Sequence, residues 1–119
     1  MNQVLLTGRL SSAPQYRELA SGSSLWSLEL TTDTPEGAWS VPVAWFDPPV
    51  PPEFGVGDEV VVLGAVRRRF FRTPAGTQSR TEVVASEVVA ATSKRKVKSV
   101  LRRATERLGA VADGEVRSV

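Results

Sequence analysis

Cysteine and histidine are both absent from the 119 residues of this chain. Without cysteine there is no disulfide, no thiolate catalysis and no cysteine-ligated metal. Without histidine, the usual general base at neutral pH and the commonest metal ligand are missing. The sequence also shows no Gly-rich phosphate loop and no paired nucleophile and base. We therefore predict a protein that is not an enzyme and holds no cofactor or metal.

Long apolar runs are absent as well, and this absence concerns membranes. No stretch approaches the roughly 18 consecutive apolar residues that a membrane-spanning helix needs. The first residues do not form a basic segment ahead of an apolar run, which a signal peptide would require. The prediction is a cytoplasmic protein with no membrane partner.

Charged residues are abundant but unevenly distributed, although the net charge is only +2. Residues 1–66 hold two arginines and eight acidic residues, a net charge of −6. Residues 67–107 hold twelve Lys or Arg and three acidic residues, a net charge of +9, and the last twelve residues carry −1. Such asymmetry is typical of proteins with a polyanionic partner, although charge alone does not identify the polyanion.

Short runs of alternating apolar and polar residues, separated by turns rich in Gly, Pro and Ser, predict an all-β core. We expect five strands, at residues 4–10, 25–32, 39–46, 59–71 and 78–91. Four prolines within residues 47–53 predict an extended, polyproline-like connector. Short connections without a helical crossover favour an antiparallel sheet, and closing it into a small barrel would cover its apolar face.

The pattern becomes helical after Ala91, where apolar residues recur with helical spacing: Val97, Val100, Leu101, Ala104 and Leu108. Thr92 or Ser93 can cap this basic helix, and Gly109 can end it. Three roles are open: a nucleic-acid arm, a membrane-surface helix, or docking of the apolar stripe on the barrel. Docking or partner contact is favoured, because Val and Ala form a weak membrane face without an aromatic anchor.

Basic and aromatic residues alternate near the tip of the last predicted hairpin: Arg67, Arg68, Arg69, Phe70, Phe71 and Arg72, with Arg80 on the returning strand. Because side chains alternate along a strand, each face presents guanidinium groups beside a ring. Cations that track phosphates beside rings that stack on bases suit a single-stranded nucleic acid. The alternative is a solvated arm whose phenylalanines pack against a partner subunit.

Three tryptophans complete the candidate residues. Trp39 and Trp45 are six residues apart on one strand and therefore share a face. Either could meet a base or belong to the core, because tryptophan is often buried. Trp26 shares a face with Leu28 and Leu30 and is assigned to the core.

Three segments in the right order resemble the bacterial single-stranded DNA-binding protein family: residues 2–10 (NQVLLTGRL), 57–67 (GDEVVVLGAVR) and 81–85 (TEVVA). The resemblance runs from Asn2 to about Val89. It implies an oligonucleotide/oligosaccharide-binding (OB) fold, a five-stranded Greek-key barrel, at residues 1–91, ahead of a basic helical tail at residues 92–119. It also implies sequence-tolerant binding of single-stranded DNA in replication, recombination or repair, in a nucleoid-associated homotetramer, with a dimer as the other possibility.

By position, the family's stacking aromatics fall on Trp39, Trp45 and Phe71, and its basic hairpin positions fall on Arg67 and Arg69. The full predicted DNA-binding set is Trp39, Trp45, Phe70, Phe71, Arg9, Arg67, Arg68, Arg69, Arg72 and Arg80. The sequence departs from the family in three ways. Prolines stand where a helix is usual, an aromatic is missing from the short loop at residues 33–38, and the acidic, Phe-terminated tail that recruits replication and repair proteins is absent.

These departures keep other functions open. One alternative is an OB-fold interaction module with little DNA affinity, which assembles with a paralogue or a replication partner through its basic helix. Single-stranded RNA is the other ligand to consider, because stacking and charge do not by themselves distinguish the two sugars.

Overall fold

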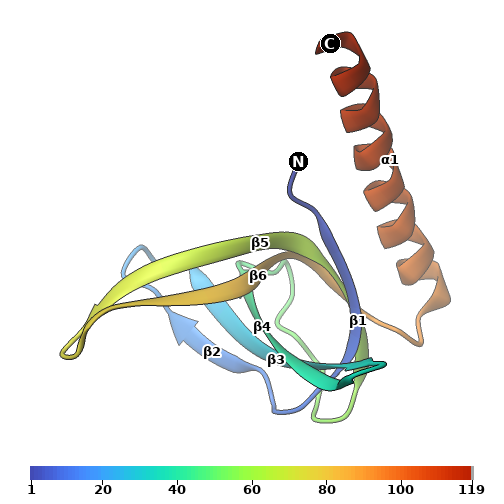
Figure 1. The fold of residues 1–119 in the computed structure, drawn as a ribbon. Helices are drawn as coiled ribbons and strands as arrows, with labels where there is room; N and C mark the ends of the chain where they lie inside the picture. The colour runs from blue at the N-terminus through green and yellow to red at the C-terminus, as the bar shows by residue number, and fades with distance from the viewer. Residues whose placement is uncertain (119) are drawn as a thin grey trace.

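A computed structural model describes residues 1–118 of the chain, with side chains described up to residue 112. Within this part, six strands precede a single helix (Figure 1). The elements are β1 (Val4–Leu10), β2 (Gln15–Glu18), β3 (Ser24–Thr34), β4 (Gly37–Phe46), β5 (Glu59–Thr73), β6 (Gly76–Ala90) and α1 (Lys94–Ser118). Residues 47–58 form a loop without strand or helix, as their proline content predicts.

Five of the strands close into a barrel, which confirms the predicted closure. The strand order is β1-β5-β6-β4-β3, and β3 returns to β1 through the pairs Arg9–Thr31 and Leu10–Leu30. The sheet is mixed rather than antiparallel, because β4 and β6 run parallel from Val43–Val83 to Trp45–Ala85. Strands around a closed ring alternate in direction only if their number is even, so five strands force at least one parallel pair. The expectation of a fully antiparallel barrel was therefore wrong.

The strand β2 was not predicted from the sequence. It pairs with β3 alone, from Gln15–Ser27 to Glu18–Ser24, and lies outside the closed ring. All four of its side chains are exposed, so it has no buried face and no apolar alternation.

The barrel core is built from alternate residues of the five strands. Leu10, Leu28, Leu30, Val60 and Val62 are almost completely buried there. Trp26 packs against this core and is only partly buried.

The other face of β5 packs against Val97, Val100 and Ala104 of the predicted apolar stripe, whereas Leu101 and Leu108 of the stripe remain exposed. Val61 and Leu63 lie in a second buried cluster with Val100 and Ala104 of α1. The helix begins after Ser93, whose carbonyl oxygen accepts a hydrogen bond from the backbone N–H of Val97 at 3.0 Å. Over the residues that the structure describes, no helix combines the length and the apolar character needed to cross a membrane.

The expected end of the helix was wrong, because α1 continues through Gly109 to Ser118. Glycine ends a helix when it takes a left-handed backbone conformation. Gly109 is not among the glycines with positive φ, and it keeps a helical backbone.

The strands β5 and β6 continue beyond the barrel as a two-stranded arm. We define the arm as residues 67–82, paired from Arg67–Glu82 to Thr73–Gly76. Figure 1 shows the arm extending to one side of the barrel while α1 rises on the other. A β-bulge at Leu63/Gly64 lies just before the arm, and a Cβ on Gly64 would lie only 2.3 Å from the carbonyl oxygen of Val84. Only glycine allows the two strands to approach this closely.

Candidate nucleic-acid interface

The arm presents guanidinium groups and phenyl rings side by side. The guanidinium carbon of Arg68 lies 5.5 Å from the ring centroid of Phe70, and that of Arg69 lies 5.2 Å from Phe71. The two pairs belong to opposite faces of β5, as strand alternation predicts. Phe70 is 65% exposed and Phe71 is 36% exposed. Folding therefore leaves both rings accessible beside a positive charge.

Glu82 of β6 holds three of the arm's cations together. Its carboxylate lies 2.5 Å from Arg67 Nη2, 3.6 Å from Arg69 Nη2 and 3.8 Å from Arg80 Nε. Glu82 is only 6% exposed, and its burial opposes ionisation. The hydrogen bond from Arg67 and the charges of Arg69 and Arg67 outweigh this burial, so the pKa of Glu82 lies below its usual value. Glu82 is thus ionised at neutral pH and offsets part of the arginine charge.

The remaining arm arginines differ in their partners. Arg80 also reaches a second acid, with Nη2 3.1 Å from Glu29 Oε1. Arg68 donates a hydrogen bond to Ser79 Oγ at 3.1 Å. Arg68 and Arg72 make no ion pair with any residue that the structure describes, so their charge is not offset within the protein.

A groove of about 770 Å³ lies at the base of the arm, between β2 and the arginines held by Glu82. Its lining includes Tyr16, Arg17 and Phe46, none of which we had assigned to DNA binding. The ring of Tyr16 lies 5.2 Å from that of Trp26, and Arg67 lies 5.4 Å from the Phe46 centroid. Phe46 follows Trp45 on β4 and so faces the opposite side, which alternation could have indicated. Tyr16 and Arg17 belong to the strand that was not predicted.

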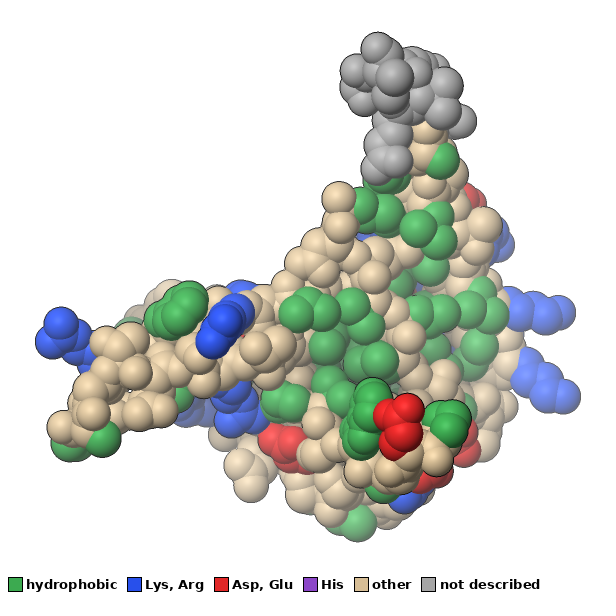
Figure 2. Space-filling view, viewed as in Figure 1, with side chains coloured by type: hydrophobic (Ala, Val, Ile, Leu, Met, Phe, Trp, Pro, Cys, Tyr) green, Lys and Arg blue, Asp and Glu red, His purple; other side chains and the backbone are tan. Residues whose placement is uncertain are grey.

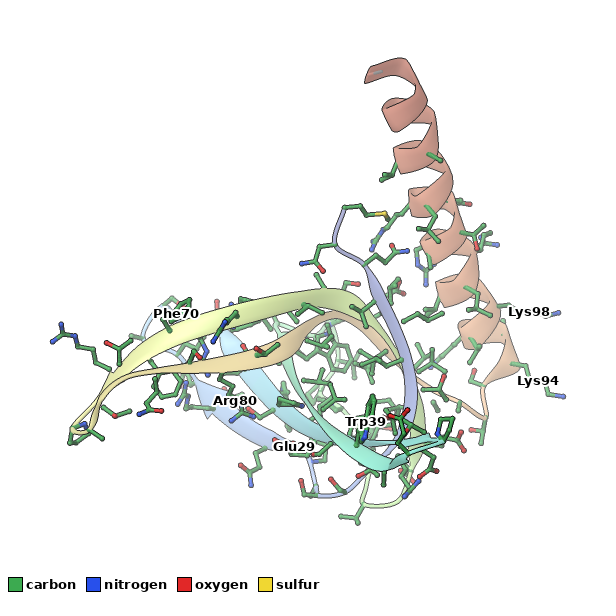
Figure 3. All side chains as sticks on the ribbon, in the orientation of Figure 1. Glu29, Trp39, Phe70, Arg80, Lys94 and Lys98 are labelled. Carbon is green, nitrogen blue, oxygen red and sulfur yellow. The ribbon has the colours of Figure 1, made fainter. Side chains whose placement is uncertain are left out.

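Two of the predicted residues lie away from the arm. Trp39 is 55% exposed near the β3–β4 turn, and Figure 3 shows it and Phe70 at opposite sides of the barrel. Arg9 is near Trp39 in the sheet, since Arg9 pairs with Thr31 and Trp39 pairs with Thr32. Arg9 Nη1 lies 2.8 Å from Asp33 Oδ2, and this hydrogen bond, with the charge of Asp33, raises the pKa of Arg9. Arg9 and Trp39 lie on the two sides of β3, and because Thr31 and Thr32 point to opposite faces of the sheet, so do the side chains paired with them.

Trp45 is the most deeply buried of the predicted aromatic residues. It is 9% exposed and lies in the barrel core, although it shares a face of β4 with Trp39. The difference arises because this face of β4 covers the core from Val43 onward, whereas Trp39 stands beyond it near the turn. Its burial favours the core role, which the sequence left open beside contact with a base.

The structure thus brings together the arm residues Arg67, Arg68, Arg69, Phe70, Phe71, Arg72 and Arg80, and leaves Trp39 and Arg9 at another end of the barrel. Among the residues described, no three acidic side chains group into a metal site. No protein-family model matches this chain, and no curated protein matches it either. A function is therefore inferred from the geometry and from the resemblance described above.

Proposed function

We propose that this chain is an OB-fold protein that binds single-stranded DNA without sequence specificity, through the arm and the groove at its base. The observation that carries the proposal is the exposed ring of Phe70 beside Arg68, on an arm that extends beyond the barrel. Every base has a flat face, so stacking on a ring is worth roughly 1–3 kcal/mol whatever the sequence. Such an arm suits a ligand whose bases are unpaired.

The arginines of the arm fall into two groups with different proposed roles in binding. Arg68 and Arg72 have no acidic partner among the described residues and are free to contact phosphates. Arg67, Arg69 and Arg80 are oriented by Glu82 along one wall of the groove. A strand that stacks on Phe71 would continue along the same face past Arg69 and Arg67 into this groove, where Tyr16 offers another ring. Phe70 and Arg68 would meet nucleotides on the opposite face of the arm.

Oligo-dT titration by fluorescence anisotropy tests the proposal. The double variant Phe70→Ala/Phe71→Ala should bind more than about tenfold more weakly, because two stacking platforms are removed. Val56→Ala is the matched control, since Val56 is an equally exposed apolar residue on the loop before β5. Unchanged affinity in a folded double variant would reject the proposal. The same titration with oligo-rU addresses the choice between DNA and RNA.

Trp39 can be tested with the same probes. Because it lies far from the arm, Trp39→Ala should weaken long oligo-dT and leave short oligo-dT unaffected. An equal loss for both lengths would instead place Trp39 beside the arm-bound bases.

We also propose a homo-oligomer, a tetramer by the family resemblance, acting in replication, recombination or repair. Exposed apolar side chains on β1, β5 and α1 support an association surface: Leu5, Val66, Leu101 and Leu108. Figure 2 shows hydrophobic side chains gathered on the face where α1 rises beside β1 and β5. Light scattering on the eluting protein, with and without oligo-dT, measures the assembly, and a monomer under both conditions would exclude it.

The same apolar side chains favour a second candidate, an interaction module that binds a paralogue or a replication protein. Leu101 and Leu108 lie one heptad apart on α1, and both remain exposed. The module would show little affinity for oligo-dT in the titration above and a tight complex with its protein partner.

A further inference from the structure

The basic residues of α1 are hardly neutralised by the rest of the protein. Among the residues that the structure describes, Lys94, Arg95, Lys96, Lys98 and Arg107 make no ion pair. Arg102 Nε is 4.0 Å from Glu106, a weak contact between exposed side chains. Arg103 alone is firmly held, with Nε 2.7 Å from Glu87 Oε2. This helix therefore carries more free positive charge than the arm does.

Part of that charge forms a row on the solvent side of the helix. Lys94, Lys98 and Arg102 are four residues apart, so they share one side and are spaced about 6 Å along the axis. Val100 and Ala104, in contrast, are buried against β5. Figure 3 shows Lys94 and Lys98 pointing away from the barrel. We call Lys94, Lys98 and Arg102 the cationic row.

This arrangement works against the stability of the helix. The first turn contains Lys94, Arg95 and Lys96 and no acidic residue, whereas the helix dipole favours negative charge there. Like charges four residues apart also repel each other. No described side chain of the barrel compensates for the cationic row. Residues that break several stabilising rules at once, without a local gain, are typical of functional sites.

We propose that the cationic row is a second nucleic-acid-binding surface that contacts the phosphates of double-stranded DNA. The described residues of α1 include no aromatic side chain, so this surface has nothing on which an unpaired base could stack. Duplex DNA offers a dense, regular line of phosphates, about one charge per 1.7 Å of axis, and needs no base contact. The surface thus differs in chemistry from the arm and does not depend on the proposed function.

A membrane surface fits these observations less well. An amphipathic helix binds a bilayer by inserting its apolar face. In α1 part of that face is occupied, because Val97 and Val100 pack against the barrel. Leu101 and Leu108 remain exposed beside the cationic row, but α1 offers no aromatic anchor in its described part.

The positions of the two surfaces suggest how they work together. The arm and α1 extend from different sides of the barrel (Figure 1). One protomer can therefore hold a single strand on the arm and a duplex on the helix. A junction between single-stranded and double-stranded DNA presents both ligands at once, and it should bind more tightly than either part alone.

The test uses the full chain and a short blunt duplex, followed by anisotropy across a range of salt concentrations. The variant Lys94→Gln/Lys98→Gln/Arg102→Gln should bind the duplex at least about tenfold more weakly at low salt. Its plot of log K against log[salt] should be shallower by about 2.7, or 0.9 for each lost phosphate contact. The matched control Lys94→Arg/Lys98→Arg keeps the charge and should keep the affinity. Circular dichroism checks that the helix remains folded in both variants.

Two further measurements separate this proposal from the function of the arm and from membrane binding. Phe70→Ala/Phe71→Ala should retain duplex binding, and the row variant should retain oligo-dT binding within about twofold. The proposal is overturned if the wild-type chain does not bind the duplex, or if the row variant binds it equally well. It is also overturned if the variant loses affinity only for phosphatidylglycerol vesicles. A failure of oligo-dT binding alone would reject only the role of the arm.

Discussion

The arm and the helix α1 are both strongly basic in sequence, but the structure makes them different surfaces. On the arm, Glu82 offsets part of the arginine charge together with Glu29 of β3, and rings alternate with the cations. On the helix, the cationic row faces solvent, without a ring and with only Glu106 nearby. A count of basic residues therefore overestimates the positive charge with which the arm can contact phosphates. It also does not show that the two surfaces differ in chemistry.

This difference assigns a separate task to each surface. A held guanidinium beside a ring provides a fixed geometry, which suits unpaired bases. A solvent-exposed row of long cationic side chains, of which only Arg102 has a weak acidic contact, provides charge without fixed geometry, which suits a phosphate backbone.

The arm depends on the close approach of strands at its base. Gly64→Ala would place a methyl group 2.3 Å from the carbonyl oxygen of Val84, so the strands must shift apart. We expect a loss of about 2–3 kcal/mol in the free energy of unfolding, measured by urea denaturation. Gly55→Ala is the control, because its nearest neighbour would be 3.9 Å away. Equal stability of the two variants would show that the bulge does not hold the arm.

The buried carboxylate of Glu82 should stabilise the arm and weaken DNA binding at the same time. In Glu82→Gln, the lost charge removes its ion pairs with Arg67 and Arg69, and stability should fall by about 1–2 kcal/mol. The freed guanidinium groups should then bind oligo-dT several-fold more tightly at low salt. A variant with lower stability and unchanged or weaker affinity would contradict the idea that Glu82 offsets the arm's charge.

Acid should reproduce this loss of stability in the unmodified chain. The folded pKa of Glu82 is lowered, so its stabilisation is complete above the pKa of an unfolded Glu, about 4.3. That stabilisation disappears as the pH falls through the lower folded value. Thermal melts between neutral pH and about pH 3 should therefore show the wild type approaching Glu82→Gln in stability. Parallel curves for the two proteins would mean that Glu82 is not the titrating group.

Several of these features were predictable from the sequence, and the others depend on packing that alternation cannot reveal. Alternation placed the barrel strands and the two faces of the arm, and helical spacing placed Val100 and Ala104 against the barrel. Alternation could not distinguish Trp45 from Trp39, because it shows which residues share a face of a strand but not which part of that face is buried. The strand β2 carries no apolar signal at all. The pairing of Glu82 with Arg67 depends on the register between β5 and β6, which the pattern within one strand does not reveal.

The salt dependence of binding measures which arginines meet phosphates. Arg68→Gln/Arg72→Gln removes two cations without acidic partners, and the slope of log K against log[salt] for oligo-dT should become shallower by about 1.4. Arg67→Gln/Glu82→Gln removes a cation together with its anion and should change the slope very little. A larger change for the second variant would show that DNA displaces Glu82 from Arg67.

The smallest expected effect lies on the helix, at Gly109. This glycine keeps a helical backbone, and a Cβ there would meet no atom within 4 Å. Gly109→Ala should therefore stabilise the chain by about 0.5–1 kcal/mol, because the unfolded state loses more conformational freedom than the helix does. The substitution changes no charge, so affinity for duplex and oligo-dT should stay the same. Gly64→Ala and Gly109→Ala should therefore have opposite effects on stability. Glycine is required at position 64 by packing near the base of the arm, whereas position 109 of the helix can accept a larger residue. If Gly109→Ala lowered stability or altered duplex binding, this part of α1 would bend or make contacts that a regular, solvent-exposed helix does not.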